Sequence, residues 1–179
     1  MKRDKISTIQ RDEVLRDFDR LSHEANEIGI RLSVVGGIPV WEPTPFLRHQ
    51  QTVARVENSI RPNPNGGGTC AGFHAADVGI RFADGSHLRP DIAIWCRVPD
   101  EQDTEVTLLP EAVIEIISKD YAAKDLVIGV PFYQRIGIPD IIVLDPETNM
   151  VRHWRNGGNE KSYPSPVTLD LLCGCAVTV

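Results

Sequence analysis

The sequence has no apolar run that approaches the ~20 residues a helix needs to cross a bilayer. Residues 1–5 are mostly charged and no apolar stretch follows them, so we predict no signal peptide. The four cysteines, Cys70, Cys96, Cys173 and Cys175, do not have zinc-ribbon spacing. We therefore expect a cytoplasmic protein, away from membranes, with reduced cysteines that serve mainly in packing.

An excess of basic residues is also missing. The formal net charge is −6 and the sequence pI is about 5.3, whereas a protein that binds nucleic acid through a broad basic face should be basic. Binding of nucleic acid would therefore need a local basic patch or a metal cation that offsets carboxylates. A phosphate-binding P-loop is excluded as well, because Gly66-Gly67-Gly68 is not followed by Lys and Ser or Thr.

The composition that is present, 41 % apolar and 25 % charged, is that of a globular protein. No internal repeat or low-complexity linker divides the 179 residues, so we predict one domain over residues 1–179. Apolar spacing, turn residues and helix-start signals predict the first elements. These are helices at 8–28 and 45–60, a hairpin at 31–35 and 38–41, strands at 70–82 and 88–96, and an exposed polar loop at 97–109.

The second half of the chain reads as strand, helix, strand. Strands are predicted at 111–117 and 140–145 with a helix at 122–136 between them, and short edge strands follow residue 151. Two strands joined through a helix form a parallel pair with a right-handed crossover. The fold class is therefore α/β, with a central mixed sheet flanked by helices.

Two carboxylates stand out because one lies inside an apolar segment and the other directly precedes one. Glu115 lies inside the run 112–117, which is typical of a strand buried on both faces. An ionised carboxylate there is costly unless a cation or hydrogen bonds meet it. Asp91 directly follows Pro90 and stands just before the apolar stretch 92–96. Taken singly, each is also compatible with an ordinary Glu or Asp at the end of a strand.

Taken together, the two carboxylates predict a metal site. On neighbouring buried strands they would repel each other unless protonated or bridged by a cation. Oxygen ligands with open positions suit Mg²⁺ or Mn²⁺. A metal held in this way can activate water and stabilise charge on a scissile phosphate.

The order of these elements resembles the PD-(D/E)XK nuclease superfamily and, in finer detail, its Uma family of restriction-endonuclease-like proteins. The resemblance covers about residues 31–155 and leaves the helix at 8–28 as an added element. The stretches that carry it are Arg48-His49-Gln50, Asp77-Val78-Gly79-Ile80-Arg81, Arg89-Pro90-Asp91, Glu115-Ile116-Ile117-Ser118, Tyr133 with Gly137-Ile138-Pro139, and Val143-Leu144-Asp145-Pro146.

The resemblance implies that Asp91 and Glu115 bind the metal, with the backbone carbonyl of Ile116 as a third ligand. It also implies metal-dependent hydrolysis of DNA phosphodiester bonds by an activated water. Many nucleases of this type cut two strands as dimers, and exposed sheet edges would permit a homodimer here.

This sequence departs from the family pattern at its lysine. The superfamily places a lysine two residues after the Glu, where this chain has Ile117, and Uma relatives place one at the position of Gly129. They also tend to carry a Glu in the first hairpin, near Leu32. Lys119 is the first surrogate, since residues 115, 117 and 119 of a strand face one way, and Lys124 is the second. Either is also compatible with a solvated surface lysine.

Two further residues are candidates for an auxiliary role. His49 opens the predicted second helix and is either a ligand for substrate or water, or a capping or surface histidine. Asp77 either joins the acidic cluster through the sheet or caps a strand pair. The leading hypothesis is a Mg²⁺- or Mn²⁺-dependent DNA endonuclease. The alternatives are a catalytically lapsed nuclease fold that binds nucleic acid or a protein, and a hydrolase of another phosphoester.

Overall fold

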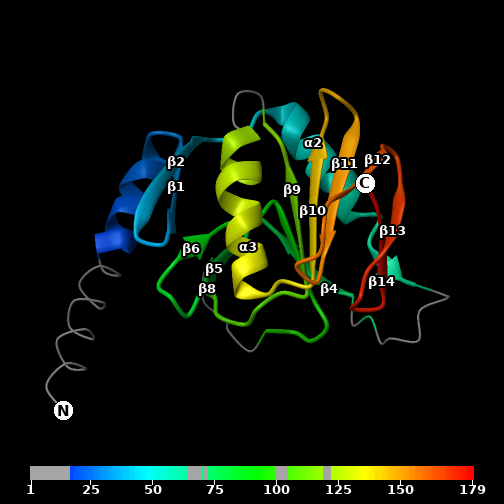
Figure 1. Ribbon diagram of the computed structural model, residues 1–179. Coiled ribbons are helices and arrows are strands. Elements are labelled where there is room, and N and C mark those ends of the chain that lie inside the picture. Colours follow the sequence, from blue (N-terminus) through cyan, green and yellow to red (C-terminus); the bar gives the residue numbers. More distant parts are fainter. Residues whose placement is uncertain (1–16, 64–69, 71, 100–104, 119–121) are drawn as a thin grey trace, which may run out of the picture.

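The computed structural model describes residues 17–63, 70, 72–99, 105–118 and 122–179. At its centre lies a six-stranded mixed sheet in the order β12-β11-β10-β9-β7-β4 (Figure 1). β9 and β10 are parallel and the other neighbours are antiparallel. The strand bounds are Phe73–Ala76 for β4, Ile92–Trp95 for β7, Ala112–Ile116 for β9, Asp140–Asp145 for β10, Met150–Arg155 for β11 and Lys161–Pro164 for β12.

Two smaller sheets flank the central one. A five-stranded sheet has the order β2-β1-β6-β5-β8, and a three-stranded sheet has the order β13-β14-β3. The bounds in the first are Ile30–Val35 for β1, Ile38–Pro43 for β2, Gly79–Arg81 for β5, His87–Leu88 for β6 and Glu105–Val106 for β8. Those in the second are Arg61–Pro62 for β3, Thr168–Asp170 for β13 and Cys175–Thr178 for β14.

Helices cover both faces of the central sheet. Helix α2 (Leu47–Glu57) packs Val53 and Val56 against one face. The helical segment 122–136 packs against the other, and it consists of a π-helical turn, η1 (Lys124–Gly129), followed by α3 (Val130–Ile136). Successive strand residues face opposite sides, so Ile92 and Ile94 of β7 face α2, whereas Ala93 and Trp95 face α3.

Most of the predicted elements are confirmed. The hairpin closes at Gly36-Gly37, where both glycines have positive φ as a tight hairpin turn requires. The helices at 45–60 and 122–136 and the parallel strands at 111–117 and 140–145 are also present. The predicted helix at 8–28 is helical at 17–27 and ends in a turn at residue 28, and residues 8–16 lie outside the described residues. None of the described helices is long and apolar enough to cross a membrane.

The predicted strands at 70–82 and 88–96 are each divided between two sheets. The first breaks at Asp77, whose φ of 56° turns the chain from β4 in the central sheet to β5 in the five-stranded sheet. The second breaks at Arg89-Pro90-Asp91, between β6 and β7. The prediction of an exposed loop at 97–109 is wrong at residues 105–106, because these form β8 and pair with β5.

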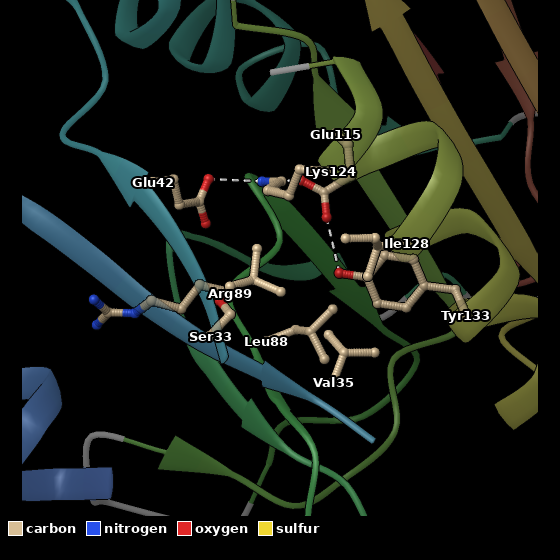
Figure 2. Close-up of a pocket in the computed structure, with 11 residues that line it drawn as sticks. Ser33, Val35, Glu42, Leu88, Arg89, Glu115, Lys124, Ile128 and Tyr133 are labelled. Carbon is tan, nitrogen blue, oxygen red and sulfur yellow. Dashed lines mark hydrogen bonds and ion pairs between the residues drawn. The ribbon is translucent and has the colours of Figure 1, made fainter. Parts of the chain in front are cut away.

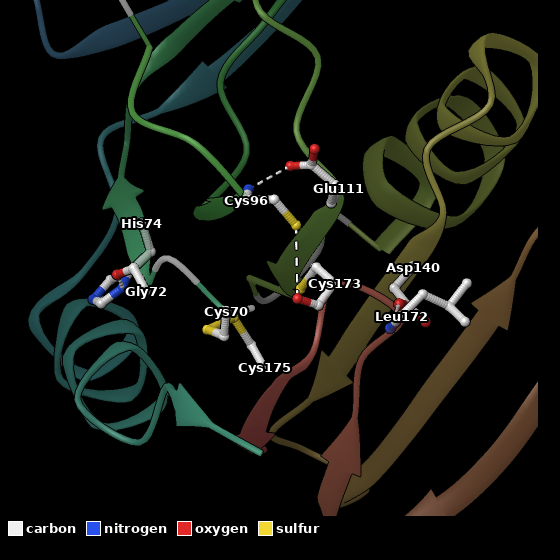
Figure 3. The surroundings of a disulfide bond; sticks show 9 residues. All are labelled: Cys70, Gly72, His74, Cys96, Glu111, Asp140, Leu172, Cys173 and Cys175. Atoms are coloured by element: carbon white, nitrogen blue, oxygen red, sulfur yellow. Dashed lines mark hydrogen bonds between the residues drawn. A yellow bond between two sulfur atoms is a disulfide. The ribbon is translucent and has the colours of Figure 1, made fainter. Parts of the chain in front are cut away.

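The expectation that all cysteines are reduced is wrong for one pair. Cys70 and Cys175 form a disulfide, because β14 brings Cys175 within a Cα–Cα distance of 4.9 Å of a residue 105 positions earlier (Figure 3). Cys96 and Cys173 remain free thiols, and Cys96 Sγ lies 3.7 Å from the Cys173 carbonyl oxygen. The disulfide therefore attaches the C-terminal sheet to the segment that leads into β4.

Candidate active site at the junction of two sheets

Asp91 and Glu115 lie side by side where the central sheet meets the five-stranded one. β7 and β9 are antiparallel neighbours, and their register brings Asp91, just before β7, opposite Glu115 near the end of β9. The Asp91 amide donates a hydrogen bond to Glu115 Oε2 over 3.3 Å. Both side chains are buried, with exposed fractions of 9 % for Asp91 and 3 % for Glu115. The pairing expected from the sequence is therefore formed.

His49, on the first turn of α2, bridges two oxygens of this site. Its Nε2 lies 2.9 Å from the Ile116 carbonyl oxygen and 3.2 Å from Asp91 Oδ2. Both oxygens are acceptors, so Nε2 carries the proton and donates. Asp91 Oδ2 also accepts from the Ile116 amide over 2.7 Å. Burial lowers the pKa of His49, but the hydrogen bond and the charge of Asp91 outweigh it, and the net pKa is raised.

Lys124, the first residue of η1, brings its ammonium group among the carboxylates. Its Nζ lies 2.9 Å from Glu42 Oε2, 3.0 Å from Asp125 Oδ1 and 4.0 Å from Glu115 Oε2. Figure 2 shows it between Glu42 of β2 and Glu115 of β9. Burial lowers the pKa of Lys124, yet Glu115, Asp125, Glu42 and Asp91 raise it well above its ordinary value. Lys124 therefore carries its charge in the site.

Glu42 is the site residue that the sequence reasoning missed. It lies 82 residues from Lys124 in the chain and reaches it from the second strand of the hairpin. Alternation in β2 puts Glu42 on the same half-buried side as Val40, while Pro39, Trp41 and Pro43 are exposed. This two-residue period is the signal that could have predicted an inward-facing position for Glu42. Leu32, near which the family resemblance places a Glu, is buried in an apolar cluster with Phe18 and Ala25.

Two carboxyl groups of the site, Glu115 and Asp125, have raised pKa values. Burial raises the pKa of the Glu115 carboxyl well above its ordinary value; Asp125 and Asp91 raise it further, against lowering by Lys124 and the Tyr133 hydroxyl. Burial also raises the pKa of Asp125 to about 6, although Lys124 opposes this. A group of carboxylates in this condition binds a proton or another cation more readily than an exposed carboxylate does.

Tyr133 of α3 fixes the other oxygen of Glu115. Its buried hydroxyl donates to Glu115 Oε1 over 2.8 Å, which leaves Oε2 directed toward Lys124 and the Asp91 amide (Figure 2). Because hydrogen bonds to charged groups are stronger than neutral ones, this contact defines the position of the carboxylate.

Tyr133→Phe should lower the free energy of unfolding by about 1–3 kcal/mol, because a buried carboxylate loses its donor. Denaturant titration measures this change. Tyr163→Phe, on edge strand β12, is the matched control and should have a smaller effect. Equal losses in the two variants would show that the hydroxyl of Tyr133 has no special part in holding Glu115.

The remaining candidate positions, Asp77, Ile117 and Gly129, have different surroundings in the structure. Asp77 donates its amide to the Asp91 carbonyl over 3.2 Å, while its carboxylate accepts from Arg31 over 2.8 Å. Ile117 packs with the apolar cluster beneath α3. At Gly129, a Cβ would stand 3.3 Å from the Lys124 carbonyl oxygen, so a lysine side chain there would crowd the π-helical turn. Lys119 lies outside the described residues.

The oxygen donors suit a hard cation. Among the described residues, no three His, Cys, Asp or Glu side chains are grouped as a formed metal site. However, the Asp91 carboxylate and the Ile116 carbonyl converge on one donor proton, that of His49, and the Glu115 carboxylate lies beside them. Mg²⁺ binds few protein oxygens and keeps several waters. These donors therefore fit Mg²⁺ or Mn²⁺ if the His49 ring moves aside.

The comparisons with known proteins agree with this architecture. The chain matches the Uma2 family, described as "Putative restriction endonuclease", over residues 15–172. A solved structure from Anabaena variabilis, described as "a putative nuclease belonging to DUF820", matches with a TM-score of 0.59 and 18 % sequence identity. The match covers 78 % of this chain and 80 % of that one, and at this identity it shows the fold. Among curated proteins none matches. The chain belongs to the Uma2 family of restriction-endonuclease-like proteins.

Proposed function

We propose that this protein is a Mg²⁺- or Mn²⁺-dependent endonuclease that hydrolyses DNA phosphodiester bonds. The observation that carries the proposal is the buried pair Asp91 and Glu115 on adjacent strands, with the charged Lys124 Nζ 4.0 Å from Glu115. Membership of the Uma2 family supports a nuclease activity in general.

Each residue has a role that follows from its position. Asp91 Oδ2, the Ile116 carbonyl and Glu115 Oε2 would hold the cation. The bound cation would supply a water of lowered pKa and neutralise charge on the phosphate. Lys124 would orient that water and stabilise negative charge, which is the work of the family lysine. Lys119, two residues after Ile117 in the sequence, is the second candidate for this role.

Tyr133, Glu42 and Asp125 would act as positioning residues. Tyr133 holds Glu115 through its hydroxyl, and Glu42 and Asp125 hold the Lys124 ammonium at 2.9 and 3.0 Å. His49 would protect Asp91 and the Ile116 carbonyl until the cation binds, and then turn toward solvent or substrate. A homodimer would bring one such site to each strand of a duplex.

A second candidate function is that of a lapsed nuclease fold that binds nucleic acid or a protein partner. The specific observation in its favour is that His49 already satisfies the two oxygens that a cation would use. The apolar Ile117 at the lysine position points the same way.

Metal titration and cleavage separate these two functions. Isothermal titration of the purified protein with Mn²⁺ should show binding, and single- and double-stranded DNA should be cut in Mn²⁺ but not in EDTA. If Mn²⁺ fails to bind both alone and in the presence of DNA, and no DNA is cut, the hydrolase proposal is wrong and the binding function is favoured.

A further inference from the structure

A groove lies directly beside the carboxylate site. It has a volume of about 320 Å³ and is formed by the start of α2, the residues that follow β9 and the turn that follows β10. His49 and Ser118 line both this groove and the small cavity that contains Asp91 and Lys124. The two spaces are therefore neighbours that share walls. Crevices outside the carboxyl ends of parallel strands are common places for ligands in α/β sheets.

The groove has the size and the chemistry of a nucleotide site. Its volume is at the lower end of the roughly 300–1,000 Å³ usual for small-ligand pockets, which suits one base with its sugar and not a base pair. Phe46 stands at its edge with 73 % of its surface exposed. A large exposed aromatic ring beside a groove is the arrangement on which unpaired bases stack.

The charged residues of the groove favour binding of a base over binding of a phosphate. Asp145 and Glu147 line one wall, and their negative charges disfavour a phosphate. Asp145 Oδ1 already accepts from the Glu147 and Thr148 amides, whereas the Glu147 carboxylate can accept hydrogen bonds from the amino groups of bases. Arg48 lines the α2 side and is exposed, so a cation is available for the backbone. The carboxylate site beyond His49 is where the next phosphate would lie.

We propose that this groove binds one unpaired base, stacked on Phe46, so that the substrate is single-stranded or locally unpaired DNA. The inference rests on the proposed nuclease function for the identity of the substrate. A base in a duplex is stacked and paired on its hydrogen-bonding edge, and it would have to leave the helix to enter.

Equilibrium binding to oligonucleotides that contain one 2-aminopurine tests the proposal. The fluorescence of 2-aminopurine falls when the base stacks, and the titration is done in EDTA so that no strand is cut. Wild-type protein should bind the single strand more tightly than the same sequence in a blunt duplex, with quenching. Phe46→Ala should weaken single-strand binding at least about fivefold and abolish the quenching, since stacking is lost.

Two variants control for exposure and for shape. Leu47 is 74 % exposed and does not belong to the described lining of the groove, so Leu47→Ala should bind as wild type does. Phe46→Trp should retain binding, because it preserves an aromatic face. Tighter binding of the duplex, or equal affinity in Phe46→Ala and Leu47→Ala, would overturn the proposal.

The outcomes also separate this inference from the proposed function. Binding that depends on Phe46, without cleavage in Mn²⁺, supports the groove and rejects hydrolysis. Cleavage in Mn²⁺ with no dependence of binding on Phe46 supports hydrolysis and rejects the groove.

Discussion

Asp91→Asn should abolish Mn²⁺ binding and reduce Mn²⁺-dependent cleavage of DNA by at least about 100-fold. In metalloenzymes, loss of a residue that only hydrogen-bonds to a metal ligand lowers metal affinity or activity by about 10- to 100-fold. Here a proposed ligand itself loses its charge. The fold should survive, because Asn keeps an oxygen that can accept from the Ile116 amide, which now donates to Asp91 Oδ2 over 2.7 Å. Titration calorimetry and single-turnover cleavage measure the two effects, and thermal unfolding verifies the fold.

Asp77→Asn is the matched control for this experiment. Asp77 touches Asp91 through the backbone, but its carboxylate is paired with Arg31, so Mn²⁺ binding should be close to that of wild type. Asp91→Ala is a poorer test, since the buried Ile116 amide would lose its acceptor at a cost of about 1–3 kcal/mol. Retained cleavage in Asp91→Asn would remove Asp91 from the catalytic site.

The two central carboxylates were predictable because each lies in or beside an apolar strand, where burial of a charged group is costly. Glu115 interrupts an apolar run and Asp91 opens another, so burial of both followed from the sequence. Lys124 was predictable only as one of two surrogates. Its approach to Glu115 depends on η1, the π-helical turn in which its side chain meets Asp125 and Glu42.

Other features depend on tertiary packing and left little trace in the sequence. Glu42 belongs to the site only because the hairpin lies against the start of the helical segment that carries Lys124. The split of the predicted strand 70–82 at Asp77 required the positive φ of that residue, which is uncommon for a residue with a side chain. The disulfide joins residues 105 positions apart, and spacing alone cannot predict such a pair.

Lys124→Met should destabilise the protein in the absence of metal and make its stability depend on Mn²⁺. Removal of the ammonium leaves Glu42, Glu115 and Asp125 without their shared cation, and breaking a buried pair in this way costs about 3–5 kcal/mol. A divalent cation that binds the folded state adds stability in proportion to its affinity and concentration. Mn²⁺ should therefore raise the melting temperature of Lys124→Met more than that of wild type.

Two further variants make the result specific to the carboxylates. Lys161→Met, at an exposed lysine of β12, should change neither the stability nor its response to Mn²⁺. Glu42→Gln combined with Lys124→Met removes one negative charge with the positive one, and it should recover part of the lost stability and respond less to Mn²⁺. Cleavage should be lost in both Lys124 variants, because Mn²⁺ restores charge but provides no ammonium to orient the attacking water. If Lys124→Met instead matches wild type in stability, in its response to Mn²⁺ and in cleavage, Lys124 neither neutralises these carboxylates nor replaces the family lysine.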